Sequence, residues 1–394
     1  MNLLYISNAS KKVGSFSLSS IQAANACGIE CYYASNWSAA DAAQIAYDES
    51  QHHVWICHVD IERTPYSPKN IGAYRRLVEL TRTHKIDVIH CNTPIGGVLG
   101  RLVGRKCNIP KVIYQAHGFH FCKGAPLLNW LMYYPVERIL ARYTDALITI
   151  NHEDHERAKK FRLRGRGNVF YVPGVGVDWK EYASVEVDAA AKRKELGLDE
   201  DDIVLISMGD LIKRKNYQVA IQALAKASHS KLRYLICGAG PEKESLKALA
   251  SALQVDDRVR FLGFRTDIKE LLRISDMFLF TSLQEGLARA LMEAMASGLP
   301  CVVSKIRGNV DLLRNGQGGF LCDPKDAEGF ARCIDTLAEN EELRQEMGTH
   351  NSNEIRDCFS IDAVEACMEE VYCDVLGVTP GKRAAKNQVV GAVR

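Results

Sequence analysis

The sequence lacks an excess of charge of either sign: its 394 residues carry 50 Lys and Arg against 48 Asp and Glu, a formal net charge of +2. A protein that holds nucleic acid through many phosphate contacts needs a basic excess, so we expect no nucleic-acid partner. With 47% hydrophobic and 25% charged residues, the composition also excludes disordered and fibrous chains. The length predicts two domains, because it exceeds that of one ordinary core.

The sequence also lacks any apolar run of the about 18 residues that a membrane span needs, and its first residues do not have a signal-peptide pattern. Its 13 cysteines include no Cys-x-x-Cys pair. Scattered thiols of this kind are typical of a reducing compartment. We therefore expect a cytoplasmic protein.

Short apolar runs alternate with longer mixed segments, which is the pattern of buried parallel strands joined by helices. The first series predicts strands at 3–6, 30–34, 54–59, 88–91, 112–115, 146–150 and 169–172. The second predicts strands at 204–207, 234–237, 259–262, 277–281, 301–304 and 320–322. We predict an α/β fold of two tandem Rossmann-like domains, each a doubly wound parallel sheet, facing a shared cleft.

The two series are separated by the turn PGVGVD and a charged stretch, which predict a linker at 176–200. The domains then cover 1–175 and 201–360. We expect a C-terminal helix at 361–376 that crosses back to the first domain. The last residues, 377–394, have no periodicity, and we expect a mobile tail there.

The most informative segment is SLQEGLARALMEAMASGLP at 282–300, where a loop with Gly286 follows a predicted strand. Residues 288–297 favour a helix that Gly298 ends. The amides at its start, with a partial charge of about +0.5, suit a phosphate. Arg289 is unfavourable at a helix N-terminus unless an anion neutralises it, which also favours a bound phosphate.

Two further segments have the same strand-to-helix character. Lys215 and Asn216 stand at the predicted start of a helix, and Gly238 and Gly240 form a turn that allows close backbone approach. The full Gly-x-Gly-x-x-Gly fingerprint is missing, which makes a dinucleotide-dependent dehydrogenase a poor alternative. Taken singly, each of these segments is as readily an ordinary solvated loop.

In this order, the motifs resemble the family-4 glycosyltransferases of the GT-B fold. The matching residues are Gly209-Asp-Leu with Lys215-Asn216, Gly238-Ala-Gly-Pro241, Gly263-Phe-Arg265, the E-x(7)-E pair Glu285/Glu293, and Ala116-His-Gly118. The stretch HGFHFCKGAPLLNWLMYYPVE at 117–137 is similar to bacterial capsule and exopolysaccharide transferases that use undecaprenyl-diphosphate-linked saccharide acceptors.

The resemblance implies that 201–360 is the nucleotide-sugar-binding domain and 1–175 the acceptor-side domain. It gives Glu293 the ribose hydroxyls, Lys215 the diphosphate and Glu285 the donor sugar, which His117 approaches from the first domain. Glu285 and His117 are the implied catalytic residues. The other implied donor-binding residues are Gly209, Gly238, Gly240, Phe264 and Arg265 near the base, Gly286, Leu287, Ala288 and Arg289. The implied acceptor-side residues are Lys12, Gly14, His120 and Lys123.

The resemblance further implies a hexosyltransferase that retains the anomeric configuration, needs no metal and no cofactor, and uses a nucleotide-sugar co-substrate, for which we expect a UDP-sugar. The chain departs from the family at Asp210, where many members have Arg. It departs again at 8–14, which has one glycine where many have two. The alternatives are a nucleotide-sugar epimerase of the same architecture and a non-catalytic nucleotide-sugar-binding subunit of a glycosyltransferase complex.

Two segments of the first domain bear on a membrane partner. Residues 126–135 are apolar and aromatic, and residues 157–166 contain six cations. Each has an ordinary interpretation, as buried packing and as a solvated helix face. Together with the basic excess of the first 190 residues, 22 cations against 17 acids, they favour loose contact with an anionic membrane surface. We expect a peripheral protein on the inner face of the plasma membrane, serving exopolysaccharide or capsule biosynthesis.

Overall fold

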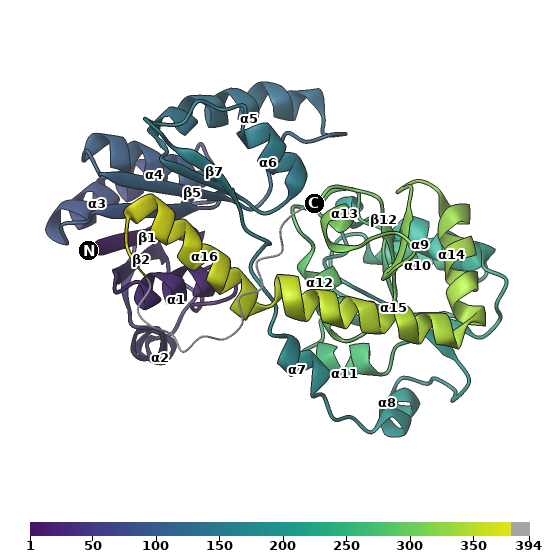
Figure 1. Cartoon of the computed structure of the whole chain (residues 1–394). Helices are drawn as coiled ribbons and strands as arrows, with labels where there is room; N and C mark the ends of the chain where they lie inside the picture. The colour runs from purple at the N-terminus through teal and green to yellow at the C-terminus, as the bar shows by residue number, and fades with distance from the viewer. Residues whose placement is uncertain (380–394) are drawn as a thin grey trace. The chain divides into compact units, whose positions relative to one another are not determined.

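The computed structural model describes residues 1–379 (Figure 1). The chain divides into two compact units. Unit 1 contains Met1–Gly176 together with the chain from Ile361, and unit 2 is Val177–Ser360. Each unit is built on one parallel sheet.

Unit 1 contains a seven-stranded sheet with the order β3-β2-β1-β4-β5-β6-β7. Its strands are β1 (Asn2–Ala9), β2 (Glu30–Asn36), β3 (Val54–His58), β4 (Val88–Asn92), β5 (Lys111–Ala116), β6 (Ala146–Thr149) and β7 (Asn168–Tyr171). Its helices are α1 (Leu18–Ala26), α2 (Ala42–His52), α3 (Lys69–Thr83), α4 (Pro94–Lys106), α5 (Leu127–Leu140), η1 (Ala141–Tyr143), α6 (His152–Ala158) and α16 (Ile361–Leu376). The strand order reverses between β1 and β4, and ligands bind at such a reversal, outside the carboxyl ends of the strands.

Unit 2 repeats this topology with six strands in the order β10-β9-β8-β11-β12-β13. The strands are β8 (Ile203–Met208), β9 (Leu232–Cys237), β10 (Val259–Gly263), β11 (Met277–Phe280), β12 (Cys301–Ser304) and β13 (Gly319–Cys322). The helices are α7 (Trp179–Ala183), α8 (Ala189–Glu195), η2 (Lys213–Lys215), α9 (Tyr217–Lys226), α10 (Lys243–Ala252), α11 (Ile268–Arg273), α12 (Arg289–Ala296), α13 (Asn309–Leu312), α14 (Ala327–Glu339), α15 (Glu341–Glu354) and η3 (Ile355–Phe359). Here the order reverses between β8 and β11.

Burial of both sheet faces explains why the strands read as continuous apolar runs. Every residue of β4, β6, β11 and β12 is buried. Helices cover both faces of each sheet and complete two hydrophobic clusters per unit. All thirteen predicted strands are present in the described residues, within three residues of their predicted ends, and the predicted fold class is confirmed.

The boundaries between the units differ from the expected linker at 176–200. This segment contains α7 and α8, and Val177, Tyr182 and Leu198 are buried in the core of unit 2. It belongs to unit 2, because its buried apolar residues join the core of that unit and Lys192 pairs with Asp267 of the same unit at 2.8 Å.

The last described helix, α16, belongs to unit 1 and lies alongside α1 (Figure 1). Its buried face carries Val364, Met368 and Tyr372. The Tyr372 hydroxyl lies 2.7 Å from Nδ1 of His90 in β4. Within the expected tail at 377–394, the residues from 380 onward lie outside the described part of the chain.

Candidate active site

The loops that follow β8 and β11 meet at the strand reversal of unit 2. Asn216 joins them: its Nδ2 donates to the carbonyls of Thr281, at 3.1 Å, and Pro324, at 2.9 Å. Asn216 adopts the left-handed conformation, φ 56° and ψ 36°, which ends the turn η2 and begins α9. Asn tolerates this conformation better than most residues, so the residue type suits both the left-handed backbone and the two side-chain hydrogen bonds.

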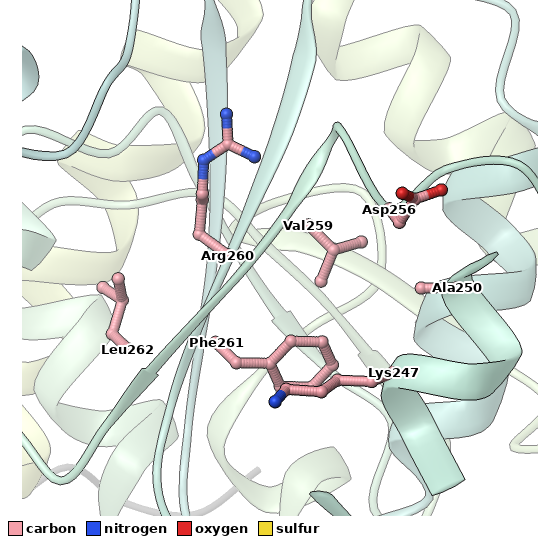
Figure 2. Close-up of a pocket in the computed structure, with 7 residues that line it drawn as sticks. All are labelled: Lys247, Ala250, Asp256, Val259, Arg260, Phe261 and Leu262. Carbon is pink, nitrogen blue, oxygen red and sulfur yellow. The ribbon is translucent and has the colours of Figure 1, made fainter. Parts of the chain in front are cut away.

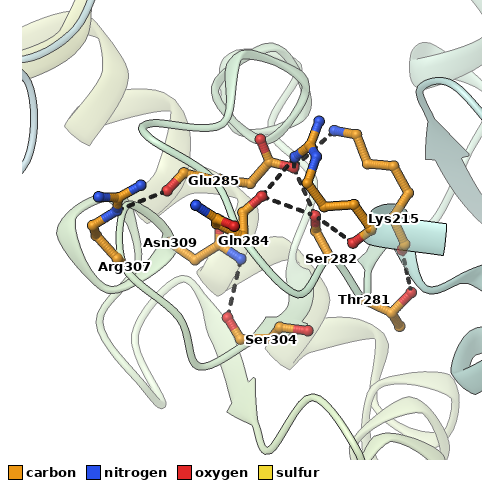
Figure 3. A network of polar contacts seen from close by, with 9 residues as sticks. Lys215, Thr281, Ser282, Gln284, Glu285, Ser304, Arg307 and Asn309 are labelled. Atoms are coloured by element: carbon orange, nitrogen blue, oxygen red, sulfur yellow. Dashed lines mark hydrogen bonds and ion pairs between the residues drawn. The ribbon is translucent and has the colours of Figure 1, made fainter. Parts of the chain in front are cut away.

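Lys215 and Glu285 form an ion pair at this reversal (Figure 3). Lys215 Nζ lies 2.9 Å from Glu285 Oε1, and the two side chains are only 14% and 12% exposed. The same oxygen accepts from Ser282 Oγ at 2.6 Å and from Arg214 at 2.9 Å. Three donors therefore converge on Oε1, while Oε2 takes none of these bonds.

The surroundings of Lys215 fix its ammonium group. Nζ lies 4.8 Å from the centre of the Phe280 ring, within the range of a cation–π contact. A Cβ on Gly209 would lie 3.4 Å from Lys215 Cε, so the side chain passes close over this glycine. The structure thus brings together the predicted residues Gly209, Lys215 and Glu285.

Glu293 lies on α12, which begins one residue after the predicted helix start at Ala288. Arg289 Nε donates to Glu293 Oε1 at 2.8 Å, an i,i+4 pair. Burial, and next the charge of Glu293, raise the pKa of Tyr182 in α7. The cation at this helix start is thus balanced by Glu293, so Arg289 by itself does not require a bound phosphate.

The predicted glycines at 238 and 240 are explained by packing between loops. A Cβ on Gly238 would lie 1.9 Å from the Gly209 carbonyl oxygen, and one on Gly240 would lie 2.4 Å from the Leu211 carbonyl oxygen. No side chain fits at these distances, so the two loops pack backbone against backbone. Their role next to a phosphate stays a prediction.

Sequence reasoning missed Arg307, whose Nε donates to the Glu285 carbonyl at 3.1 Å (Figure 3). The following residue, Gly308, packs against the loop at Gly286: a Cβ on Gly308 would lie 2.4 Å from the Gly286 carbonyl oxygen. The usable signal was position, because Arg307 comes three residues after β12, at the same carboxyl edge as Thr281.

The residues expected near the base lie after β10. Phe264 is 82% exposed. Arg265 instead bonds two carboxylates, Asp267 at 2.7 Å and Glu195 at 3.2 Å, and the hydrogen bond from Arg265 lowers the pKa of Asp267. Both residues are in unit 2, and contact with a base stays a prediction for each.

In unit 1, His117 follows β5 and points toward β4. Its Nε2 lies 2.8 Å from Asn92 Oδ1, and Phe16 makes an edge-to-face contact with its ring at 5.2 Å. Nδ1 is inaccessible to solvent and has no hydrogen-bond partner among the described residues. Burial lowers the pKa of His117 to about 4, so the ring is neutral at pH 7. Since an amide oxygen only accepts, Nε2 carries the proton and Nδ1 is an acceptor.

The implied acceptor-side residues lie in two loops of unit 1, after β1 and β5. Lys12 is exposed, and the Gly14 carbonyl accepts from the amides that begin α1. His120 is exposed and stacks on Tyr133 of α5 at 4.6 Å. Lys123 is exposed, and its amide donates to Glu153 at 2.7 Å. Sequence reasoning missed Phe16 and Asn92, which complete the surroundings of His117.

The carboxylates that could hold a metal ion form a group that lies away from this site. In the described part of the chain, one group of three such side chains is found, Asp199, Asp201 and Asp202. It includes an Asp-x-Asp spacing that the metal-free expectation did not take into account. Asp201 and Asp202 pair with Lys231 and Arg233, at 2.9 and 3.1 Å. The group precedes β8, at the opposite end of the strand from Gly209.

A surface pocket of about 340 Å³ also lies elsewhere in unit 2, between α10 and the edge strand β10 (Figure 2). Its lining includes Lys247, Phe261 and Arg260, and none of the predicted site residues. Among residues 1–379, no helix has both the length and the apolarity to cross a bilayer.

Comparison with known proteins finds two family matches. Glycosyl transferases group 1 matches residues 188–354, and the glycosyl transferase 4-like domain matches residues 32–174. EpsD of Bacillus subtilis (strain 168), a glycosyltransferase by name, is 39% identical over 295 residues, 74% of this chain and 77% of EpsD. The UDP-Gal:α-D-GlcNAc-diphosphoundecaprenol α-1,3-galactosyltransferase of Escherichia coli is 29% identical over 313 residues, 78% of this chain and 80% of that protein.

Among solved structures, Anabaena Alr3699/HepE in complex with UDP and glucose matches with a TM-score of 0.77 at 22% identity. The match covers 95% of this chain and 100% of HepE. The structure thus has a known fold, and the sequence match to EpsD extends over about three quarters of the chain. The chain belongs to the family-4 glycosyltransferases and has their GT-B fold.

Proposed function

We propose that this glycosyltransferase moves a sugar from a UDP-sugar to an undecaprenyl-diphosphate-linked saccharide during bacterial surface polysaccharide synthesis. The main observation behind this proposal is the largely buried ion pair of Lys215 and Glu285 at the strand reversal of unit 2. Two comparisons support the substrates. The E. coli relative is named for UDP-Gal and a diphosphoundecaprenol acceptor, and the HepE structure contains UDP.

In this proposal the donor diphosphate binds Lys215, and a hydroxyl of the donor sugar donates to Glu285. The Lys215 ammonium can contact Glu285 and a phosphate oxygen together, because an ammonium group binds oxygen atoms as a point charge, without a fixed direction. Glu285 keeps Oε2 for a sugar hydroxyl, since the three protein donors converge on Oε1. Glu293 binds the ribose hydroxyls, with Arg289 holding its carboxylate in place.

We propose retention by attack on the face of the leaving group. The acceptor hydroxyl oxygen bonds to the anomeric carbon, the bond from that carbon to the diphosphate oxygen breaks, and the hydroxyl proton passes to a donor phosphate oxygen. Lys215 stabilises the charge on the leaving diphosphate. His117, which is neutral at pH 7, transfers no proton. Product analysis by NMR tests retention, because an inverted anomeric signal would contradict this step.

We also propose that no divalent cation takes part. The charge of the diphosphate is met by Lys215, and by Arg214 on the same carboxylate, while the aspartate group lies at the other end of β8. The expected result is equal transfer rates in EDTA and in added Mg²⁺ or Mn²⁺. Loss of transfer in EDTA that Mg²⁺ restores would contradict the metal-free mechanism.

The proposed function is tested by incubating the protein with UDP-sugar, first alone and then with a lipid-linked saccharide. Transfer appears only with the acceptor. Isomerised sugar nucleotide without acceptor would identify an epimerase, and binding without turnover would identify a non-catalytic subunit. Lys215→Ala and Glu293→Ala are expected to lower transfer by at least about tenfold. Lys213→Ala, in the same turn but exposed, is the matched control and leaves transfer near the parent rate.

The proposed location is the inner face of the plasma membrane, where the lipid-linked acceptor is held. An enzyme with such an acceptor and a water-soluble donor works at the boundary between bilayer and cytoplasm. Cell fractionation tests this proposal: recovery in a membrane fraction that 1 M salt releases supports peripheral attachment, and recovery in the soluble fraction alone contradicts it.

A further inference from the structure

Helix α5 exposes a row of large apolar side chains that nothing in unit 1 covers. Six of them are between 41% and 74% exposed: Leu127, Leu128, Leu131, Met132, Val136 and Ile139. At about 100° per residue, these positions fall within about half of the helix circumference. We call this half the outer face of α5. Scattered exposed apolar residues are ordinary, whereas six on one helix face form a contiguous patch.

The opposite face of α5 is firmly packed, so the exposure of the outer face is not a sign of loose attachment. Trp130, Tyr133 and Tyr134 pack against the core of unit 1. Glu137 accepts from Arg101 at 2.7 Å and from the Tyr114 hydroxyl at 3.1 Å. These contacts of the inner face hold the helix in place, and its aliphatic outer face stays exposed. A helix that is apolar on both faces needs a second apolar surface to cover it.

The dimensions of α5 exclude a spanning role. Its 14 residues extend about 21 Å, less than the about 30 Å of a bilayer core. Its inner face is also committed to unit 1. A helix of this length and character lies in the plane of the bilayer surface, with its apolar face among the upper acyl chains.

Cations flank the outer face and identify the charge of the surface that it fits. Exposed Arg138 lies on α5, and exposed Arg142 follows directly in η1. Arg157 of α6 lies over the Trp130 ring at 4.4 Å, which places α6 beside the packed face of α5. The segment after α6 adds exposed Lys160 and Arg162. Anionic lipid headgroups complement such a combination of aliphatic and basic side chains.

We propose that the outer face of α5 is a docking surface for an anionic phospholipid bilayer. The aliphatic row enters the acyl boundary, and Arg138 and Arg142, on and directly after α5, contact lipid phosphates. The loop between His117 and α5 contains His120 and Lys123, so docking would bring these acceptor-side candidates to the headgroup layer. The inference rests on the proposed membrane location and names the surface responsible. Docking needs neither the donor nor the acceptor, so it holds or fails separately from the proposed transfer.

The test is flotation of the full chain with vesicles of phosphatidylglycerol and phosphatidylcholine, compared with phosphatidylcholine alone. The expected result is binding to the anionic vesicles that weakens with salt. Leu131→Glu should lower the partition coefficient at least about tenfold, because it places a charge in the acyl boundary. The matched control is Ile71→Glu on α3 of the same unit, a 60% exposed apolar residue outside the row, which should bind as the parent does.

Two readouts separate docking from other effects of the substitution. UDP affinity and thermal unfolding of Leu131→Glu should match those of the parent, which shows that the variant is folded. Hydrogen exchange in α5 should be slower on anionic vesicles than in buffer. Equal vesicle binding by parent and Leu131→Glu would overturn the proposal. So would dissociation of a parent dimer by Leu131→Glu without loss of vesicle binding, which would assign the face to a second copy.

Discussion

Replacing Glu285 with Gln should tighten UDP binding while it removes transfer. The substitution keeps the shape of the side chain and its bond from Ser282, and it removes one negative charge beside Lys215. In the parent, the carboxylate and an incoming diphosphate share the same ammonium group. The variant leaves that ammonium entirely to the phosphate. Turnover falls because the neutral amide is a weaker acceptor for the sugar hydroxyl.

The size of the effect follows from the geometry of the pair. Nζ lies 2.9 Å from Oε1. A phosphate oxygen on the other side of the ammonium would lie about 5 to 6 Å from the carboxylate. At effective dielectric constants of about 20 to 40, two unit charges at this distance repel by about 1.5 to 3 kcal/mol. Arg214 on the same oxygen offsets part of this repulsion. We therefore expect about 1 to 2 kcal/mol, or about 5- to 30-fold tighter binding of UDP.

Isothermal titration with UDP measures this change, and transfer from UDP-sugar is measured on the same preparations. Glu293→Gln is the matched control, since it removes the same charge eight residues away and should weaken UDP binding through the lost ribose contact. Lys215→Ala should weaken it as well. Weaker UDP binding by Glu285→Gln than by the parent would refute the competition between carboxylate and diphosphate.

Three further predictions concern stability, each measured by urea unfolding. Gly238→Ala should lose about 2 to 4 kcal/mol, because its Cβ would lie 1.9 Å from a carbonyl oxygen, whereas Gly263→Ala, with open space around it, should lose about 1 kcal/mol; equal losses would contradict the backbone packing. Arg101→Leu should lose about 3 kcal/mol by leaving the Glu137 carboxylate without its cation, and adding Glu137→Leu should restore most of it; a double variant no more stable than the single one would count against a buried pair. Burial lowers the pKa of His90 to about 3, below an unfolded value of about 6.5, so the unfolded state binds the proton first. Stability should be full above pH 6.5 and decline toward pH 3, by at most about 1.4 kcal/mol per pH unit from this group, and His90→Gln should flatten that decline; an unchanged slope would show that His90 is not responsible.

The sequence was sufficient for the fold because parallel strands covered on both faces are continuous apolar runs. The βαβ alternation then leaves few topologies, because right-handed crossovers cover both faces of an open sheet only if the strand order reverses. Lys215 and Glu285 could be related before the structure, since each follows a strand of the second series and carboxyl ends of parallel strands share one edge. Their direct contact could not, because it depends on how two loops 70 residues apart close over Asn216.

Other features of the site differ in whether the sequence could have predicted them. The pairing of Arg289 with Glu293 could have been predicted, because residues four apart are neighbours on a helix. The contact of His117 with Asn92 depends on the register of β4 against β5, which spacing does not give. The sequence of 176–200 predicts a linker, because its charge outweighs its few apolar residues. Burial of Tyr182 and Leu198 depends on the neighbours that tertiary packing supplies.

The return of α16 to unit 1 has a consequence for the order of folding during synthesis. Residues of α16, among them Val364, Met368 and Tyr372, complete a core whose remaining members lie in the first 176 residues. The ribosome therefore synthesises the whole of unit 2 before it releases α16, the helix that completes unit 1. Until then His90 lacks its contact with the Tyr372 ring, and the apolar residues of this core that pack on α16 stay uncovered. Cleavage after Gly176 would yield two fragments. The C-terminal fragment would contain the complete core of unit 2, whereas the N-terminal fragment would lack the α16 residues of the unit 1 core.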